Sequence, residues 1–286
     1  MAIHFPAKIL LFGEYTVLNG SQALAIPFHQ WKGEWVQRDT TPAIDPVDYY
    51  RWLLNSDLIN DATYTRMLDE HKSGWQYQSD IPAGYGVGSS GAYVAAVYAR
   101  YIHSEADHDF EHLTGMLAKM ESWFHGSSSG MDPLVSYRQK ALYKDQKGAF
   151  HCIQDPGWPA GFNVYLLDSQ STRHTSPLVQ KYKVLLQDPH FHQDVLHQLV
   201  PMVEHAIHFY LGGEGPMLKE CLQVISQFQR THFQEMIPAS VRSVWDQLSE
   251  MPGVFVKLCG AGGGGYYLVM DTGNHDLQPY PLISVS

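Results

Sequence analysis

Apolar and polar positions along the amino-terminal half alternate between short strand-like runs and longer stretches with helical spacing. Residues 6–28 alternate apolar runs with turn residues, a pattern typical of strands joined by a hairpin. The stretch 46–72 has helical character, and residues 91–102 are rich in alanine, which favours a helix. In the stretch 113–124, apolar side chains recur at the spacing of one helix face. This half therefore predicts paired strands followed by helices.

The carboxyl-terminal half mixes the same elements in a different order. Residues 162–168 predict a strand, and residues 253–258 and 266–270 predict two more that flank a glycine-rich loop. Helices are predicted between them, at 177–187, 191–211 and 216–229. Because the elements lack a regular strand–helix–strand alternation, an α+β fold is favoured over a doubly wound sheet. Glycine and proline near residue 160 predict an amino-terminal domain of residues 1–160 and a carboxyl-terminal domain of residues 161–286.

Composition narrows the class of protein. The 286 residues are 44% apolar and 17% charged, as in an ordinary globular protein. A formal charge of −10 argues against nucleic acid as a partner, whereas a small phosphorylated ligand needs only local amides and one lysine. Cys152, Cys221 and Cys259 show no zinc or disulfide spacing, which suits a reducing cytosol. The apolar run 9–12 is too short for a signal peptide or membrane span, so we expect a cytoplasmic protein without a membrane partner.

Glycine is concentrated in three segments, residues 82–90, 125–132 and 257–265. Such segments are retained where the backbone must approach something closely or adopt positive φ. The first precedes the alanine-rich helix, so Ser89 and Ser90 fall at the amino terminus of that helix. Free amides and hydroxyls at this position bind anions such as phosphate. The segment therefore predicts a cradle for the phosphates of a nucleotide.

Other readings of these motifs fail on their context. Residues 86–91 match the dinucleotide-binding pattern G-x-G-x-x-G, but a proline and a glycine interrupt the strand that should precede it. Residues 126–130 match the nucleophile elbow of serine hydrolases with Ser128 as nucleophile, but here a helix precedes and Asp-Pro follows. The sequence contains no G-x-x-x-x-G-K-[ST] run. The histidines of segment 190–208 lack acidic or cysteine partners at ligand spacing and are expected on the surface.

What remains is a set of residues suited to phosphoryl transfer. Magnesium prefers hard oxygen ligands and keeps several waters, so one hydroxyl and one carboxylate suffice, with Ser90 and Glu121 as candidates. Glu121 lies at the edge of its apolar stripe, so it either faces into the fold or a cleft or is solvated. Asp132 precedes Pro133, which predicts an extended loop where a carboxylate can take a proton from an attacking hydroxyl. Lys8 can neutralise charge beside it.

The motifs, in this order over residues 6–270, resemble those of the galactokinase, homoserine kinase, mevalonate kinase and phosphomevalonate kinase (GHMP) superfamily. Residues 121–132 resemble the Glu…His-Gly-x-Pro-Ser-Gly-x-Asp signature of the mevalonate kinase family, with the same separation between the two acids. Residues 169–176 are similar to a family segment that begins the second domain. The resemblance implies a ribosomal protein S5 domain 2-like amino-terminal ATP-binding domain and a shortened ferredoxin-like carboxyl-terminal domain.

The resemblance also implies a role for each matching residue. It implies ATP-binding residues Gly84, Gly86, Gly88, Ser89 and Ser90, metal ligands Ser90 and Glu121, catalytic residues Asp132 and Lys8, substrate-binding residues Glu14, Tyr15 and Thr175, and a structural glycine loop with Gly260, Gly262 and Gly263. Asp132 would act as general base on the substrate hydroxyl, and Lys8 would lower the pKa of that hydroxyl. Three positions depart from the family pattern: Ser128 replaces a proline, Gly91 an alanine, and Tyr15 a histidine common in mevalonate kinases.

The implied reaction transfers the γ-phosphate of ATP, with Mg²⁺, to a hydroxyl of a small molecule, and mevalonate is the favoured acceptor. Phosphomevalonate, a sugar or homoserine stay open as other acceptors. A catalytically silent binding relative is an alternative of a different class. Both a monomer and a homodimer are compatible with the sequence.

Overall fold

The computed structural model of the chain describes residues 3–38, 45–103, 109–172 and 175–285. These residues form helices and two β-sheets, and the predicted α+β class is confirmed. The chain divides into two compact units, the first of Met1–Lys8, Pro27–Pro82 and Gly88–Leu142 and the second of Ile9–Ile26, Ala83–Val87 and Tyr143–Ser286. Within the described ranges, no helix is both long enough and apolar enough to traverse a lipid bilayer.

The first sheet contains the hairpin that the sequence predicts. Its strands are β1 (His4–Phe12), β2 (Ala23–Gln37), β3 (Trp75–Ser79), β4 (Ala141–Lys144) and β5 (Phe150–Ile153). The strands are hydrogen-bonded in the order β1-β2-β4-β5, and β3 pairs with β2 in antiparallel register from Gly33–Ser79 to Gln37–Trp75. A short 3-10 helix, η1 (Thr16–Asn19), lies between β1 and β2. Strand β2 continues beyond residue 28, where the predicted strand pattern ends, because β3 pairs with the outer part of β2, residues 33–37.

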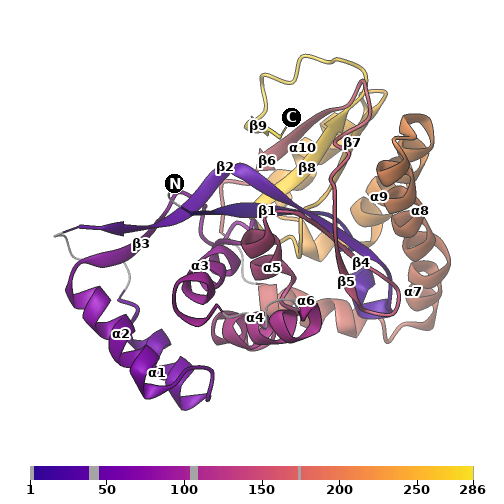
Figure 1. The fold of residues 1–286 in the computed structure, drawn as a ribbon. Helices are drawn as coiled ribbons and strands as arrows, with labels where there is room; N and C mark the ends of the chain where they lie inside the picture. Colours follow the sequence, from indigo (N-terminus) through magenta and orange to yellow (C-terminus); the bar gives the residue numbers. More distant parts are fainter. Residues whose placement is uncertain (1–2, 39–44, 104–108, 173–174, 286) are drawn as a thin grey trace. The chain divides into compact units, whose positions relative to one another are not determined.

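Helices α3, α4 and α5 of the first unit pack on one another (Figure 1). The helices of this unit are α1 (Val47–Asn55), α2 (Asp61–Lys72), α3 (Ser89–Val97), the π-helical turn η2 (Tyr98–Ile102), α4 (Phe110–His125) and α5 (Met131–Arg138). Three residues of the predicted apolar stripe of α4 are buried, with Leu113, Leu117 and Met120 each 0% exposed, whereas the fourth, Phe124, is 40% exposed, so its expected burial was wrong. This stripe fixes which face of α4 turns inward.

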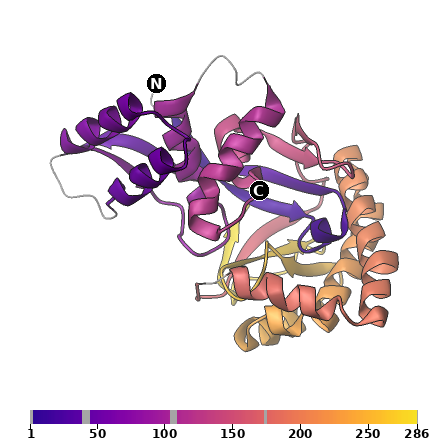
Figure 2. The ribbon, with the colours of Figure 1, turned by 90° about the horizontal axis from the view of Figure 1, so that it is seen from below.

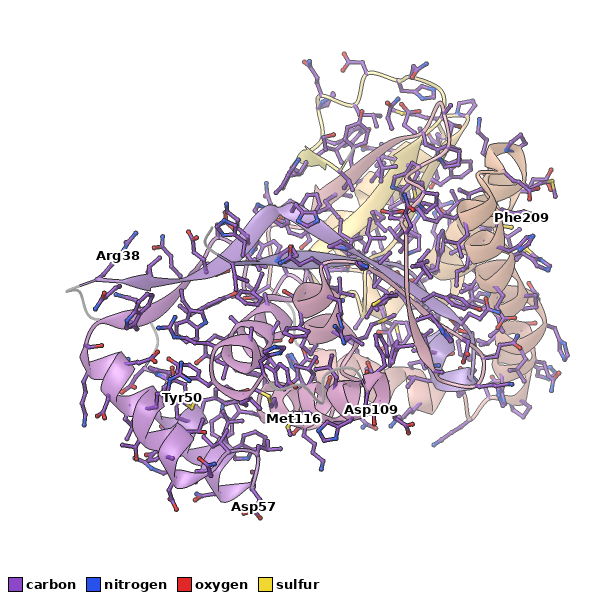
Figure 3. The ribbon with its side chains drawn as sticks, viewed as in Figure 1. Arg38, Tyr50, Asp57, Asp109, Met116 and Phe209 are labelled. Carbon is purple, nitrogen blue, oxygen red and sulfur yellow. The ribbon has the colours of Figure 1, made fainter. Side chains whose placement is uncertain are left out.

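Side-chain caps mark where two helices of the first unit, α2 and α4, begin. The predicted helical stretch 46–72 is two helices, and α2 starts where the Asn60 side chain accepts a hydrogen bond from the Thr63 amide. Asp109 caps α4 in the same way through the amides of Glu111 and His112, and its position is marked in Figure 3.

The second unit carries the other sheet and a helical layer (Figure 2). Its strands are β6 (Asn163–Asp168), β7 (Val254–Leu258), β8 (Tyr266–Asp271) and β9 (Leu282–Ser284), which pair antiparallel in the order β7-β8-β6-β9. Its helical elements are α6 (Thr175–Leu185), α7 (Pro189–Asp194), η4 (Val195–Leu199), α8 (Val200–Gly212), α9 (Gly215–His232), η5 (Gln234–Met236) and α10 (Ala239–Ser249). The predicted strands β6, β7 and β8 are confirmed, and the predicted helix over 191–211 is divided into α7, a π-helical segment and α8.

The compact units do not follow a single cut in the sequence. Residues 143–160 belong to the second unit by their contacts, and the division between units also falls within β1 and β2. The domain boundary at residue 160 stays a prediction that rests on the glycine and proline residues near it.

Candidate active site

The amino terminus of α3 has the form that the first glycine-rich segment predicts. Gly88 precedes the helix with φ 80°, a conformation that glycine adopts without a Cβ penalty. A Cβ at this position would also lie 2.7 Å from Cγ of Lys8, so the backbone passes close beneath that side chain. Ser89 and Ser90 form the first turn, where backbone N–H groups have no acceptor within the helix. This turn can bind an anion next to a lysine.

Lys8 and Asp132 form an ion pair within the first unit. Nζ of Lys8 lies 3.0 Å from Oδ1 of Asp132. The lysine comes from β1 and is 6% exposed, whereas the aspartate is 33% exposed. The pair therefore combines a buried cation with a carboxylate that reaches solvent.

Asp132 does not lie in the extended loop that its proline neighbour predicts. It belongs to the first turn of α5, which begins at Met131 after Gly130. Pro133 is accepted there because the first turn of a helix needs no backbone N–H from its residues, and the proline φ is already helical. The expectation of an extended conformation was wrong, and the carboxylate instead lies at a helix amino terminus, where negative charge is stabilised.

Glu121 faces inward from α4 and is 3% exposed, so of the two placements open from the sequence the solvated one is excluded. Burial raises the pKa of its carboxyl from 4.5 to about 8, and the nearby charge of Asp132 adds to the rise. Hydrogen bonds from Ser128 and Ser90 and the charge of Lys8 oppose this rise in pKa. The structure therefore brings together the hydroxyl of Ser90 and the carboxylates of Glu121 and Asp132.

Two further residues at this site escaped sequence reasoning. The Ser128 hydroxyl donates to Oε2 of Glu121 and accepts the Gly130 N–H at 2.9 Å. Nε2 of His125 lies 2.9 Å from Oγ of Ser90. The sequence held one signal for Ser128, its departure from the family's proline. That departure did not indicate a contact with Glu121, because the chain leaves α4 between the two residues and helical spacing no longer applies.

The residues present fit a magnesium ion. Ser90 and Glu121 offer hard oxygen ligands, and a divalent cation would offset the repulsion between Glu121 and Asp132. In the part of the chain that the structure describes, no group of three or more His, Cys, Asp or Glu side chains could hold a metal by itself. The protein would thus supply a minority of the ligands, as Mg²⁺ bound together with phosphate requires.

Glu14 and Tyr15, the predicted substrate-binding residues, are both buried in the second unit. Glu14 accepts a hydrogen bond from Lys257, and both side chains are 1% exposed. Tyr15 has φ 62°, donates its hydroxyl to the Ala261 carbonyl at 2.6 Å, and has its ring centroid 4.7 Å from that of Tyr182. Thr175 begins α6, but its side chain lies outside the described residues. The substrate role of these residues stays a prediction.

The remaining predicted glycines also lie in the second unit. Positive φ is found at Gly84, Gly86, Gly260, Gly262 and Gly263. The last glycine-rich segment contacts the first one near these residues: a Cβ on Gly265 would meet the Tyr85 carbonyl oxygen, and the Tyr266 amide donates to that oxygen at 3.3 Å.

The sequence predicts that the histidines of segment 190–208 lie on the surface. The histidines of segment 190–208 are exposed or partly exposed. Of the cysteines, Cys152 is exposed and the other two are buried.

Comparisons with known proteins find similarity to this chain both in sequence and in fold. Residues 59–140, which include α3, α4 and α5, match the sequence profile of the GHMP kinases N terminal domain. A mevalonate kinase of Archaeoglobus fulgidus is 25% identical over 272 residues, covering 91% of this chain and 88% of that protein.

Solved structures show the same fold. The Methanococcus jannaschii mevalonate kinase superposes with a TM-score of 0.65 at 16% identity, covering 99% of this chain and 96% of that one. A Streptococcus pneumoniae phosphomevalonate kinase in complex with phosphomevalonate and AMPPNP superposes with a TM-score of 0.64 at 16% identity, covering 95% of this chain and 92% of that one. Since proteins with different acceptors superpose equally well, the fold by itself does not select an acceptor.

Proposed function

Because this chain belongs to the GHMP kinase superfamily, we propose that it transfers the γ-phosphate of ATP, with Mg²⁺, to the hydroxyl of mevalonate. The observation that carries the proposal is the convergence of Ser90, Glu121 and Asp132 beside the buried Lys8. A hydroxyl, two carboxylates and a lysine at a helix amino terminus match the needs of phosphoryl transfer, which are positioning and charge neutralisation.

The nucleotide side of the site belongs to the start of α3. The amides of its first turn and the preceding glycines would hold the phosphates, and Ser90 and Glu121 would hold Mg²⁺. Bound there, the ion would neutralise charge on the β- and γ-phosphates. Lys8 adds a second positive charge at the edge of the same turn.

Asp132 is the proposed general base. Its carboxylate is partly exposed, so an acceptor hydroxyl can approach it, and the ion pair with Lys8 fixes its position. The aspartate would take the hydroxyl proton as the oxygen attacks phosphorus, and the lysine would stabilise the charge that develops on that oxygen. A positioned base of this kind contributes about 10²–10⁴-fold to the rate.

The choice of mevalonate rests on the curated relative at 25% identity and on the signature in residues 121–132. A phosphorylated acceptor would call for additional basic residues, and few lysines or arginines lie near the motifs in the sequence. The acceptor roles of Glu14, Tyr15 and Thr175, and a cytoplasmic location, belong to the same proposal.

Release of ADP from MgATP over a panel of acceptors tests the proposal. The panel contains mevalonate, phosphomevalonate, homoserine and common sugars, each with wild-type protein and with the variant Asp132→Asn. We expect mevalonate to give the highest kcat/KM with wild-type protein, and we expect Asp132→Asn to lose this activity. Turnover with another acceptor would support the kinase activity but contradict mevalonate as its substrate. If no compound of the panel gives acceptor-dependent ADP release, the proposed enzyme activity is wrong.

A further inference from the structure

Ser128 lies in the sequence between Glu121, the proposed metal ligand, and Asp132, the proposed general base. It lies in the loop that leaves α4 after Glu121 and enters α5 before Asp132. Its side chain is partly buried, whereas the neighbouring Ser127 is exposed. The family pattern has a proline here, so the hydroxyl is a feature of this chain.

The hydrogen bonds of Ser128 fix the direction of its hydroxyl. Oγ accepts the Gly130 N–H at 2.9 Å, and the hydroxyl donates to Oε2 of Glu121. An oxygen that accepts from an amide is a better donor through its own hydrogen, so the two bonds reinforce each other. Because Gly130 precedes the first turn of α5, this chain of bonds ties the end of α4 to the helix that carries Asp132.

This arrangement suits a carboxylate that must bind a cation. An ionised glutamate offers about four acceptor positions, and Ser128 uses one of them on Oε2. Ser90 also hydrogen-bonds to Glu121. A donor on one oxygen restricts rotation of the carboxylate, and partners of this kind orient the ligands of metal sites in general.

We propose that Ser128 is a positioning residue of the metal site, holding Glu121 in the orientation that binds the magnesium of the nucleotide complex. The inference rests on the proposed function, since it takes Glu121 as a metal ligand. The competing explanation is that Ser128 only shapes the loop, as a proline at this position would.

The test measures how much Mg²⁺ tightens the binding of AMPPNP, a non-hydrolysable ATP analogue. The dissociation constant of AMPPNP is determined by calorimetry with and without saturating Mg²⁺, and the ratio of the two values is the metal-dependent gain. Ser128→Ala should reduce this gain about 10–100-fold, the usual effect of losing such a partner, and leave metal-free binding unchanged. Unchanged metal-free binding also reports that the variant is folded.

Three further variants separate the hydroxyl from the shape of the loop. Ser128→Thr keeps a hydroxyl and should retain most of the gain. Ser128→Pro restores the family residue and should lose the gain as Ser128→Ala does. Ser127→Ala removes an exposed hydroxyl one residue away and should behave as wild type.

The outcomes distinguish the inference from the proposed function. If wild-type protein shows no metal-dependent gain, the proposed metal site itself is wrong. If wild type shows the gain and Ser128→Pro or Ser128→Ala retains it in full, Ser128 only shapes the loop and the inference is overturned. In steady state, Ser128→Ala should raise the Mg²⁺ concentration needed for half-maximal rate.

Discussion

Two lysine–carboxylate pairs of this chain have the same chemistry and opposite surroundings. Lys8 and Asp132, in the first unit, leave the carboxylate 33% exposed. Lys257 and Glu14, in the second unit, are both 1% exposed, and the lysine also donates to the Leu258 carbonyl at 2.6 Å. A carboxylate that reaches solvent can exchange a proton with a ligand, whereas a sealed pair is held by the surrounding protein. Exposure, more than residue type, therefore separates the candidate base from the structural pair.

Replacing the open carboxylate should give the largest effect. Asp132→Asn keeps an oxygen that can accept from Lys8 but cannot take a proton, so turnover should fall about 10²–10⁴-fold. ATP affinity and the melting temperature should change little. Steady-state kinetics and nucleotide titration measure the two quantities, and Asp109→Asn, which retains the cap of α4, is the matched control. A variant that keeps more than about a tenth of wild-type turnover would remove Asp132 as the base.

Breaking the sealed pair should lower the stability of the folded protein. Lys257→Met leaves the buried Glu14 charge without its partner, and the free energy of unfolding should fall by about 3–5 kcal/mol. Chemical denaturation measures the loss. The double variant Lys257→Met with Glu14→Leu removes both charges and should recover much of it, because a buried pair replaced by apolar residues is often neutral. A single variant as stable as wild type would show that the pair is not the structural element described here.

The position of the open pair depends on the close approach of α3 and α5. A Cβ on Gly91 would lie 2.8 Å from the Asp132 carbonyl carbon and 2.9 Å from its Cβ, so Gly91→Ala should push the helices apart. We expect a loss of about 1–3 kcal/mol in stability and a reduced kcat, since small displacements of catalytic groups are costly. Gly115→Ala is the control, because nothing lies within 4 Å of a Cβ there. Since the family pattern has alanine at position 91, full activity of Gly91→Ala would mean that α3 and α5 separate without harm.

Glu121 is intermediate between the two pairs, buried yet next to the open carboxylate. Its pKa of about 8 in the folded protein exceeds the ordinary 4.5, so the folded state holds this proton more tightly than the unfolded state does. Stability from this group is present below pH 4.5 and is lost as the pH rises through 8. Without metal and nucleotide, Glu121→Gln should therefore gain melting temperature relative to wild type as the pH rises from about 5 to about 9.

The same variant should weaken the response to magnesium. Glutamine keeps an oxygen that accepts from Ser128 but lacks the negative charge, so the Mg²⁺ requirement for turnover should rise about 10-fold or more. A rate measured against Mg²⁺ at fixed ATP gives the value. An unaltered titration would remove Glu121 from the metal site, and a melting difference independent of pH would contradict its raised pKa.

Most secondary structure could be predicted from periodicity and turn residues, because those signals are local. The hairpin of β1 and β2, the buried stripe of α4 and the strands β7 and β8 all follow from apolar spacing. The start of α5 could not be predicted in this way. Proline disrupts a helix interior but is tolerated in the first turn of a helix, and the sequence does not show whether Pro133 follows a loop or lies in such a first turn. The compact units also escaped prediction, since they join segments distant in sequence.

The sequence by itself determined the chemical groups of this protein: the glycine-bordered start of α3, its two serines, and the acids and lysine that match a phosphoryl-transfer family. Only the tertiary structure decided which of the lysine–carboxylate pairs is open, that Glu121 points inward, and that Ser128 bonds to it. Residue types and their local spacing can be read from the sequence, whereas the exposure of a side chain and its distance from side chains on other elements are set only when the helices and strands pack. The interaction energy and the pKa of a charged group differ between a buried site and water, so the packing of the fold sets the chemistry of these groups.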